Sequence, residues 1–176
     1  MTAKAAPGVL QGTVVFTDIV GFTEYTALRG DEEALALLSL QERLVREALP
    51  SRSRIVKEIG DGLLLWFSDA CDALDACLRL QRRFETESTE AVGPLWVRMG
   101  LHFGYQTQRG DDLVGHDVNV ASRIVDVAGP GEVLLSEATL VQVDDKLPDV
   151  SLEELGPVVM KGIPQPLRLY RASRNS

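Results

Sequence analysis

The residues with the clearest chemical potential lie in the segment Phe16-Thr17-Asp18-Ile19-Val20-Gly21-Phe22-Thr23. The preceding run, Thr13 to Phe16, predicts a buried strand that delivers the carboxylate of Asp18 at its C-terminal edge. Gly21 lets the backbone turn closely before a helix begins. Backbone N–H groups at such a turn favour an anion, and the adjacent carboxylate favours a divalent cation. The segment is therefore a candidate site for a metal-chelated polyphosphate, with simple capping of the next helix by Asp18 as the alternative.

A second carboxylate, Asp61, lies 61 − 18 = 43 residues further on. The pattern from Arg54 to Phe67 predicts two strands joined by a tight Gly-Asp turn, with Asp61 at the tip. If this hairpin pairs beside the first strand, the two carboxylates lie next to each other. Two carboxylates without His or Cys suit Mg²⁺ or Mn²⁺ rather than zinc. The alternative is that Gly60-Asp61-Gly62 serves only as a hairpin turn.

Polar and basic residues further along the chain supply what two carboxylates lack. Asn119 and Arg123 have i, i+4 spacing, so both project from one face of a helix, where an amide and a permanent cation suit a sugar beside a reacting phosphate. Arg98 interrupts an otherwise apolar strand, and an arginine there needs a partner because burying it unpaired is costly. Lys161 lies in a tight turn between strands. The alternatives are a solvent-facing polar stripe for the helix pair and an exposed turn residue for the lysine.

Together these segments resemble the class III adenylate and guanylate cyclase catalytic domain, in the order in which that family has them. The resemblance runs from about Gly12 to Tyr170 and rests on Phe-Thr-Asp-Ile-Val-Gly-Phe-Thr, Lys-Glu-Ile-Gly-Asp-Gly, Val-Arg-Met-Gly-Leu-His-Phe-Gly, Gly-His-Asp-Val-Asn-Val-Ala-Ser-Arg and Met-Lys-Gly-Ile. Each motif alone is weak, but five in register make a coincidental match very improbable. The resemblance implies an enzyme that converts ATP to 3′,5′-cyclic AMP and pyrophosphate with two Mg²⁺ or Mn²⁺ ions per site.

The resemblance also assigns a role to each matching residue. Its metal ligands are Asp18, Ile19 and Asp61; its phosphate-binding residues are Phe22, Thr23, Arg98 and Lys161; and its catalytic residues are Asn119 and Arg123. In the family, the matching asparagine orients the ribose and the arginine stabilises the pentavalent phosphorus. No dedicated base is evident, so the proton acceptor is Asp18, a water or the substrate phosphate. The two histidines, His102 and His116, match no catalytic position of the family and are given structural roles.

Lys57 and Asp112 occupy the positions at which the family selects its base. Adenine presents a donor at its exocyclic amine and an acceptor at the neighbouring ring nitrogen, whereas guanine reverses this pattern. A lysine donor with an aspartate acceptor therefore selects ATP, and a glutamate in place of Lys57 would select GTP. Asp111 and Asp117 lie nearby and are alternatives to Asp112.

In the family, the metal-binding aspartates of one subunit meet the base, ribose and phosphate residues of the other. Since every one of these positions is matched within this chain, the resemblance implies a homodimer with two shared sites related by a two-fold axis.

Composition agrees with a soluble enzyme domain. The 176 residues are 45% hydrophobic, enough for one domain with a real core, and the net charge of −8 argues against nucleic acid as a partner. Cys71 and Cys77 have neither metal nor redox spacing, as expected of reduced cysteines in a cytosolic protein. Residues 1–11 do not form a signal peptide, and no apolar run reaches the ~20 residues that span a bilayer. We expect a cytoplasmic location without a membrane segment.

The order of predicted elements is typical of an α/β (α+β) fold with a ferredoxin-like βαββαβ core and a C-terminal extension, as in class III cyclases. The predicted elements are a strand at Thr13–Asp18, a helix from about Glu24 to Ala48, the hairpin Arg54–Phe67, a helix from Asp69 to about Glu85, a loop at Thr86–Pro94, strands at Leu95–Gly104 and Glu132–Leu135, a helix at Asn119–Val127, and two strands flanking Lys161–Pro164. We expect the catalytic domain to span residues 12–172, between tails at 1–11 and 173–176.

Three other functions compete with this interpretation. A non-catalytic nucleotide-binding regulator on a decayed cyclase fold would lack a metal aspartate, the asparagine or the arginine, and none is missing. A phospho-accepting receiver domain also places an aspartate at a strand end, but the central hairpin breaks its alternating βα order. A guanylate cyclase is disfavoured by Lys57.

Overall fold

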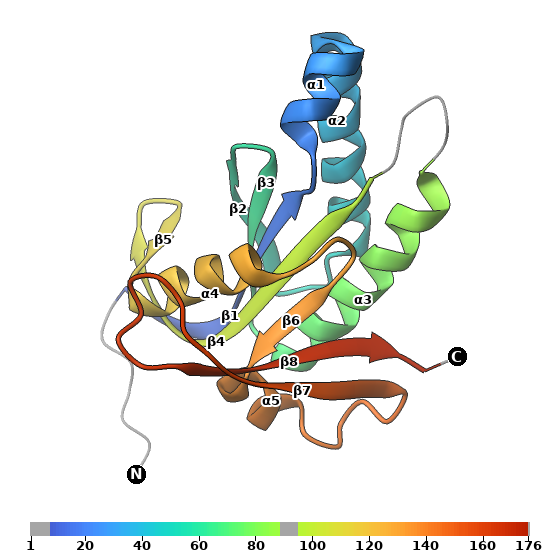
Figure 1. The fold of residues 1–176 in the computed structure, drawn as a ribbon. Helices are drawn as coiled ribbons and strands as arrows, with labels where there is room; N and C mark the ends of the chain where they lie inside the picture. Colours follow the sequence, from blue (N-terminus) through green and yellow to red (C-terminus); the bar gives the residue numbers. More distant parts are fainter. Residues whose placement is uncertain (1–7, 89–94, 176) are drawn as a thin grey trace.

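The computed structural model describes residues 8–88 and 95–175, and its elements follow the order strand, two helices, hairpin, helix, long strand and a mixed C-terminal part (Figure 1). The elements are β1 (Val9–Ile19), α1 (Phe22–Arg29), α2 (Asp31–Ala48), β2 (Ser53–Ile59), β3 (Gly62–Phe67), α3 (Ala70–Glu87), β4 (Val97–Arg109), β5 (Asp112–Val114), α4 (His116–Val127), β6 (Val133–Ser136), α5 (Glu137–Val143), β7 (Val150–Val158) and β8 (Leu167–Arg174).

One sheet organises the chain, with the strand order β2-β3-β1-β4-β6-β8-β7 and with β5 paired to β4. The first four strands in this order, β2-β3-β1-β4, pair antiparallel throughout, as in a ferredoxin-like core. β6 then adds parallel to β4, and β8 and β7 extend the sheet. The predicted ferredoxin-like core with a C-terminal extension is confirmed.

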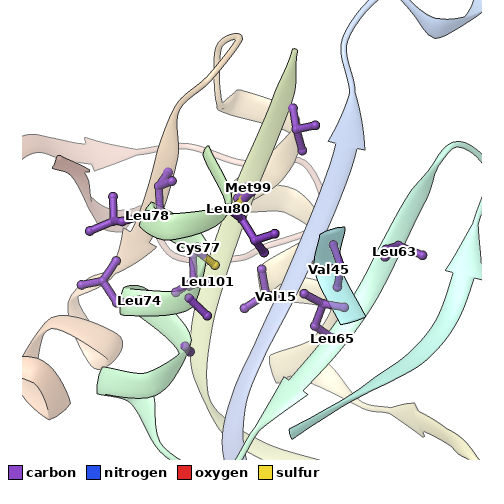
Figure 2. Close-up of a cluster of buried hydrophobic side chains, with 14 of the residues drawn as sticks. Val15, Val45, Leu63, Leu65, Leu74, Cys77, Leu78, Leu80, Met99 and Leu101 are labelled. Carbon is purple, nitrogen blue, oxygen red and sulfur yellow. The ribbon is translucent and has the colours of Figure 1, made fainter. Parts of the chain in front are cut away.

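The main hydrophobic core lies between the sheet and the helices α2 and α3. The strands of the central sheet alternate their side chains, so Val15 of β1, Leu65 of β3 and Leu101 of β4 point to the same face. There they meet Val45 of α2 and Leu74 of α3, all of them essentially inaccessible to solvent (Figure 2). Burial of this face fixes the register of the central strands, because a shift by one residue would turn the apolar side chains outward.

The opposite face of the sheet carries α4, which crosses in front of β1, β4 and β6 in Figure 1. Gly100 allows the close approach of α4 to β4: a Cβ atom there would lie 2.5 Å from the backbone nitrogen of Val125. Val14, on the same face, packs against Val118 and Ala121 of the helix. Asp18 and Arg98 have the same strand parity as Val14 and Gly100, so this face also holds the polar residues singled out by sequence.

Several boundaries differ from the predicted ones. The single helix expected from Glu24 to Ala48 is wrong: Gly30, with φ of 91° and ψ of 168°, separates α1 from α2. β4 continues beyond Gly104 to Arg109, and the elements β5 and α5 were not predicted. Of the loop expected at Thr86–Pro94, Thr86 and Glu87 belong to α3, whereas residues 89–94 lie outside the described residues. β1 starts at Val9 and β8 ends at Arg174; the domain limits at residues 12 and 172 stay predictions.

Within residues 8–88 and 95–175, no helix is both long enough and apolar enough to cross a lipid bilayer.

Candidate active site

The end of β1 and the tip of the β2–β3 hairpin are locked together. A Cβ atom at Gly62 would lie only 1.8 Å from the carbonyl oxygen of Thr17, so the absent side chain lets the hairpin lie directly on β1. The hydroxyl of Thr17 accepts the N–H of Leu63 at 3.0 Å, and the buried amide of Gln41 in α2 donates to the carbonyl of Asp61 at 3.1 Å. These contacts hold Asp61 beside the strand end that carries Asp18.

Asp18 and Asp61 interact directly, and their proximity perturbs one of them. The pKa of Asp61 is raised to about 7, first because the carboxyl is partly buried and then because of a hydrogen bond with Asp18 and its negative charge; Arg98 opposes the rise. Two adjacent carboxylates repel each other when both are ionised, so an added positive charge would favour the doubly ionised state. The structure thus brings together the two predicted metal-binding side chains.

The donor set fits a hard divalent cation. Mg²⁺ and Mn²⁺ bind oxygen ligands and keep several waters or substrate oxygens, so two protein carboxylates suffice. Residues 8–88 and 95–175 contain no group of three or more His, Cys, Asp and Glu side chains arranged for a metal ion. Ile19, the third predicted ligand, is 3% exposed and has an apolar side chain, so only its backbone carbonyl is suited to the role.

Arg98 lies opposite Asp18 on β4 and binds it. The Nε and Nη2 atoms of Arg98 lie 2.8 and 2.6 Å from the same oxygen of Asp18, and Nη1 donates to the carbonyl oxygen of Asp126 at 3.2 Å. The predicted phosphate-binding cation therefore lies at the carboxylate pair and partly neutralises it. We call Asp18, Asp61 and Arg98 the carboxylate centre.

The helix α1 starts three residues after β1 ends. Gly21 before it has φ of 73°, and no side chain caps the first turn, which begins with Phe22 and the exposed Thr23. The first N–H groups of a helix have no intrahelical partner and attract anions. This geometry suits the phosphate contact predicted for these two residues, which stays a prediction.

Lys57 and Asp112 meet where β2 faces β5, two residues before β2 ends at Ile59. Nζ of Lys57 in β2 lies 2.9 Å from Oδ2 of Asp112 in β5, and this hydrogen bond is the main reason that the pKa of Asp112 is lowered. Of the three aspartates considered from sequence, Asp112 is the one that contacts Lys57: the backbone carbonyl of Asp111 accepts from Arg54, and Asp117 bonds to β4. The side chains of the pair are 42% and 35% exposed, and therefore accessible to a ligand.

Asn119 and Arg123 project from the outer side of α4, as their spacing predicts. Neighbouring positions, including Val120 and Ile124, are buried against the sheet and fix the rotation of the helix. Asn119 is exposed, and Arg123 is 39% exposed with a long contact of 3.4 Å to Asp126. Both polar groups are thus available from solvent.

Lys161 lies in the exposed turn between β7 and β8, and its neighbour anchors that turn to α4. Met160 is 5% exposed and packs against Val120 and Ile124, while the N–H of Ile163 bonds to the carbonyl of Met160 at 3.2 Å. The lysine is therefore held on the side of the molecule that carries α4. We call Lys57, Asp112, Asn119, Arg123 and Lys161 the open set. Among the described residues, no hydrogen bond or ion pair joins the open set to Asp18 or Asp61.

Two residues of the site were not singled out from sequence. Asp126 accepts from Arg98 through its carbonyl and from Arg123 through its carboxylate, and its i, i+3 spacing from Arg123 was a usable signal. Gln41 lies on the apolar face of α2, between Leu37 and Leu44, and is 2% exposed. A polar side chain in such a stripe signals a specific buried hydrogen bond.

Comparisons with known proteins agree with this architecture. The family model described as "Adenylate and Guanylate cyclase catalytic domain" matches residues 7–172. The chain is 31% identical over 175 residues to the pH-sensitive adenylate cyclase MT1302 of Mycobacterium tuberculosis (strain CDC 1551 / Oshkosh), with 98% of this chain and 43% of that protein covered. It is 35% identical over 126 residues to an adenylate cyclase of Streptomyces griseus, with 71% and 31% covered. The chain thus spans less than half the length of either relative.

Among solved structures, the adenylyl cyclase CyaB from P. aeruginosa superimposes with a TM-score of 0.82, at 24% identity and with 96% of each chain covered. At this identity the match speaks for the fold, and it confirms the class III cyclase architecture predicted from sequence. From the family model and the identity to MT1302, the chain belongs to the family of adenylate and guanylate cyclase catalytic domains.

Proposed function

We propose that this chain is an adenylate cyclase that converts ATP to 3′,5′-cyclic AMP and pyrophosphate. The observation that carries the choice of ATP is the contact of 2.9 Å between Lys57 of β2 and Asp112 of β5. The pair offers a donor and an acceptor side by side, which match the ring nitrogen and the exocyclic amine of adenine. The relatives named adenylate cyclase support the same choice.

The chemistry is an intramolecular phosphoryl transfer. The ribose 3′-oxygen forms a bond to the α-phosphorus, the bond from that phosphorus to the bridging oxygen breaks, and pyrophosphate leaves; the 3′-hydroxyl proton passes to Asp18, a water or a substrate phosphate. Asp18 and Asp61 would hold Mg²⁺ or Mn²⁺, two ions per site, and the metal would supply positive charge for the attacking and leaving oxygens.

The protein's own side chains orient the ribose and neutralise the charge on the phosphates. Asn119 holds the ribose so that its 3′-oxygen points at the α-phosphorus, a gain in orientation that converts directly into rate. Arg123 and Lys161 place positive charge against the phosphates as negative charge spreads over them. In this proposal Arg98 and the N–H groups of Phe22 and Thr23 bind the remaining phosphates, which is supported by the contact of Arg98 with Asp18 and by the uncapped start of α1.

The functional unit in this proposal is a homodimer. Among the described residues the carboxylate centre and the open set share no hydrogen bond, and a two-fold pair lets the carboxylate centre of one subunit face the open set of the other. Each dimer then has two equivalent sites. We propose the cytoplasm as its location, since ATP and reduced cysteines are found there.

A turnover assay tests this proposal. Purified protein is incubated with ATP or GTP, with Mn²⁺, Mg²⁺ or a chelator, and cyclic nucleotide and pyrophosphate are quantified at several protein concentrations. The proposal predicts cyclic AMP formation that requires the metal, exceeds cyclic GTP formation, and rises more steeply than linearly with protein concentration below the dimer dissociation constant. Preferential formation of cyclic GTP would reverse the assignment of Lys57 and Asp112.

A further inference from the structure

His102 on β4 lies at the centre of a buried chain of hydrogen bonds that ends on α4. The residue is 6% exposed, with Nδ1 2.7 Å from the hydroxyl of Ser136 and Nε2 3.2 Å from Oδ1 of Asp117. The hydroxyl of Ser136 lies 2.9 Å from that of Thr139. The chain thus connects β6 and α5 through β4 to the first turn of α4.

The direction of each proton follows from the end groups. The N–H of Tyr105 donates to Oδ2 of Asp117 at 2.7 Å, and the other carboxylate oxygen can only accept, so Nε2 of His102 carries the proton. Nδ1 then accepts from Ser136, whose oxygen accepts from Thr139. Burial is the largest influence on His102 and lowers its pKa, against the opposing effect of Asp117, which agrees with a neutral imidazole.

The geometry of β4 leaves room for this contact with α4. A Cβ atom at Gly104 would lie 2.2 Å from Oδ2 of Asp117, so only a glycine lets the carboxylate reach the strand. Gly115 before the helix provides no side-chain cap. Asp117 therefore fixes the first turn of α4, while the close packing of Val125 on Gly100 fixes its last turn.

We propose that Asp117 and His102 are positioning residues for the cyclase reaction and act by holding α4 in place. This inference rests on the proposed function, in which Asn119 and Arg123 contact the substrate. These two residues follow Asp117 by two and six positions on the same helix, so any movement of its first turn displaces them directly. A displacement of about 1 Å can lower a rate on the order of 10²-fold.

Steady-state kinetics with ATP and Mn²⁺ test the proposal. Asp117→Ala should lower kcat about 10²-fold and leave KM within about threefold, because orientation in the transition state is lost rather than the substrate contacts. His102→Gln keeps an N–H near the position of Nε2 and should retain at least about ten times the kcat of His102→Ala. If His102→Ala does not fold, Asp117→Ala carries the test alone, since Asp117 is more exposed than His102.

Gln106→Met is the matched control. Gln106 is also a fully buried polar residue of β4, but its hydrogen bonds run to Trp66 and to the carbonyl of Gly12 instead of α4. The Gln106→Met substitution should lower the midpoint of thermal unfolding and leave kcat within about threefold of the wild type. Hydrogen exchange should in turn show faster exchange of α4 amides in Asp117→Ala than in Gln106→Met.

Arg123→Ala, measured in parallel, separates the two claims. If Arg123→Ala is inactive but Asp117→Ala has a normal kcat, positioning by Asp117 is wrong while the proposed function stands. If Gln106→Met loses as much kcat as Asp117→Ala, positioning by Asp117 is also wrong, because the loss would then result from general destabilisation of the fold. If Arg123→Ala is fully active, the proposed active site is wrong, and so is the inference about Asp117 and His102 that depends on it.

Discussion

The carboxylate centre and the open set differ in how far the chain completes them by itself. Asp18 contacts both Arg98 and Asp61, at a junction where Gly62 lies directly on β1. The open set lies on exposed or half-exposed surfaces, with Lys57 and Asp112 paired and Asn119 free to meet a ligand from solvent. The carboxylate centre is therefore held by contacts within the chain, whereas the side chains of the open set are accessible to a ligand or a second subunit.

This contrast has a physical consequence for binding. Preorganised charges cost little reorganisation when a cation and phosphates arrive, which favours catalysis. Exposed side chains gain strength only when water is excluded from them, and a second subunit or a bound nucleotide provides that exclusion. The difference between the two regions therefore supports a site that is completed on dimerisation, and the substitutions below test that difference.

Removing a carboxylate from the carboxylate centre should have the largest effect. Asp61→Ala or Asp18→Ala should lower metal-dependent turnover by about 10³-fold or more, since within residues 8–88 and 95–175 no third acidic side chain joins the pair in a metal-binding group. Cyclic AMP formation with Mn²⁺ is the measurement, and circular dichroism checks the fold. Near-normal turnover by either folded variant would remove that aspartate from the metal site.

Removing the cationic side chain of Arg123 from α4 should reduce turnover somewhat less than removing either aspartate. Arg123→Ala should lower kcat on the order of 10²-fold with a small change in KM, because its charge acts on the transition state. Arg43→Ala is a matched control, since Arg43 also pairs with an acidic residue on its own helix, at 3.3 Å. That exposed pair contributes at most about 0.5 kcal/mol, and turnover of the control should match the wild type.

Reversing the charge at the base position should alter the choice of substrate. Lys57→Glu should lower kcat/KM for ATP at least about 30-fold and shift the ratio of ATP to GTP turnover towards GTP, because the donor facing the adenine ring nitrogen is lost. Lys146→Glu, at an exposed loop position outside the site, should leave the ratio unchanged. An unaltered ratio in Lys57→Glu would show that Lys57 does not contact the base.

The smallest effect is expected at the partner of Lys57. Asp112→Asn keeps one oxygen acceptor and loses the charge that pairs with Lys57, so kcat/KM for ATP should fall about tenfold, the scale of one charged hydrogen bond. Asp111→Asn is the control, because Asp111 contacts Arg54 through its backbone rather than its side chain. Equal losses in the two variants would contradict the assignment of Asp112.

Much of this arrangement can be predicted from the sequence. The contacts and elements that cannot be predicted are missed for physical reasons. The strand ending in Asp18 and the Gly-Asp hairpin have strong local patterns, so their elements were predicted. The ion pair between Arg98 and Asp18 depends on pairing strands 80 residues apart, which no local pattern encodes. β5 comprises three residues, too few to show a period of two.

Two other features that were not predicted, the break at Gly30 and the helix α5, do have local signals in the sequence. Gly30 interrupts the apolar spacing of one predicted helix, and the structure shows that its positive φ ends α1. Ser136 caps α5 by accepting the N–H of Thr139, a start signal for a helix of only seven residues. The adjacency of Lys57 and Asp112 followed from the family resemblance rather than from spacing, because β2 and β5 are joined only by the folded sheet.

Complementation between two inactive variants tests the shared site most directly. Asp18→Ala lacks a metal ligand and Arg123→Ala lacks transition-state charge, so each homodimer should keep at most about a hundredth of the wild-type turnover. In a mixed dimer, one site carries both defects and the other has an intact Asp18 from one subunit and an intact Arg123 from the other. Activity should return to about half the wild-type value per mixed dimer, and to about a quarter after statistical mixing. No recovery, with subunit exchange shown by native mass spectrometry, would place both residues in a single subunit's site and contradict the account.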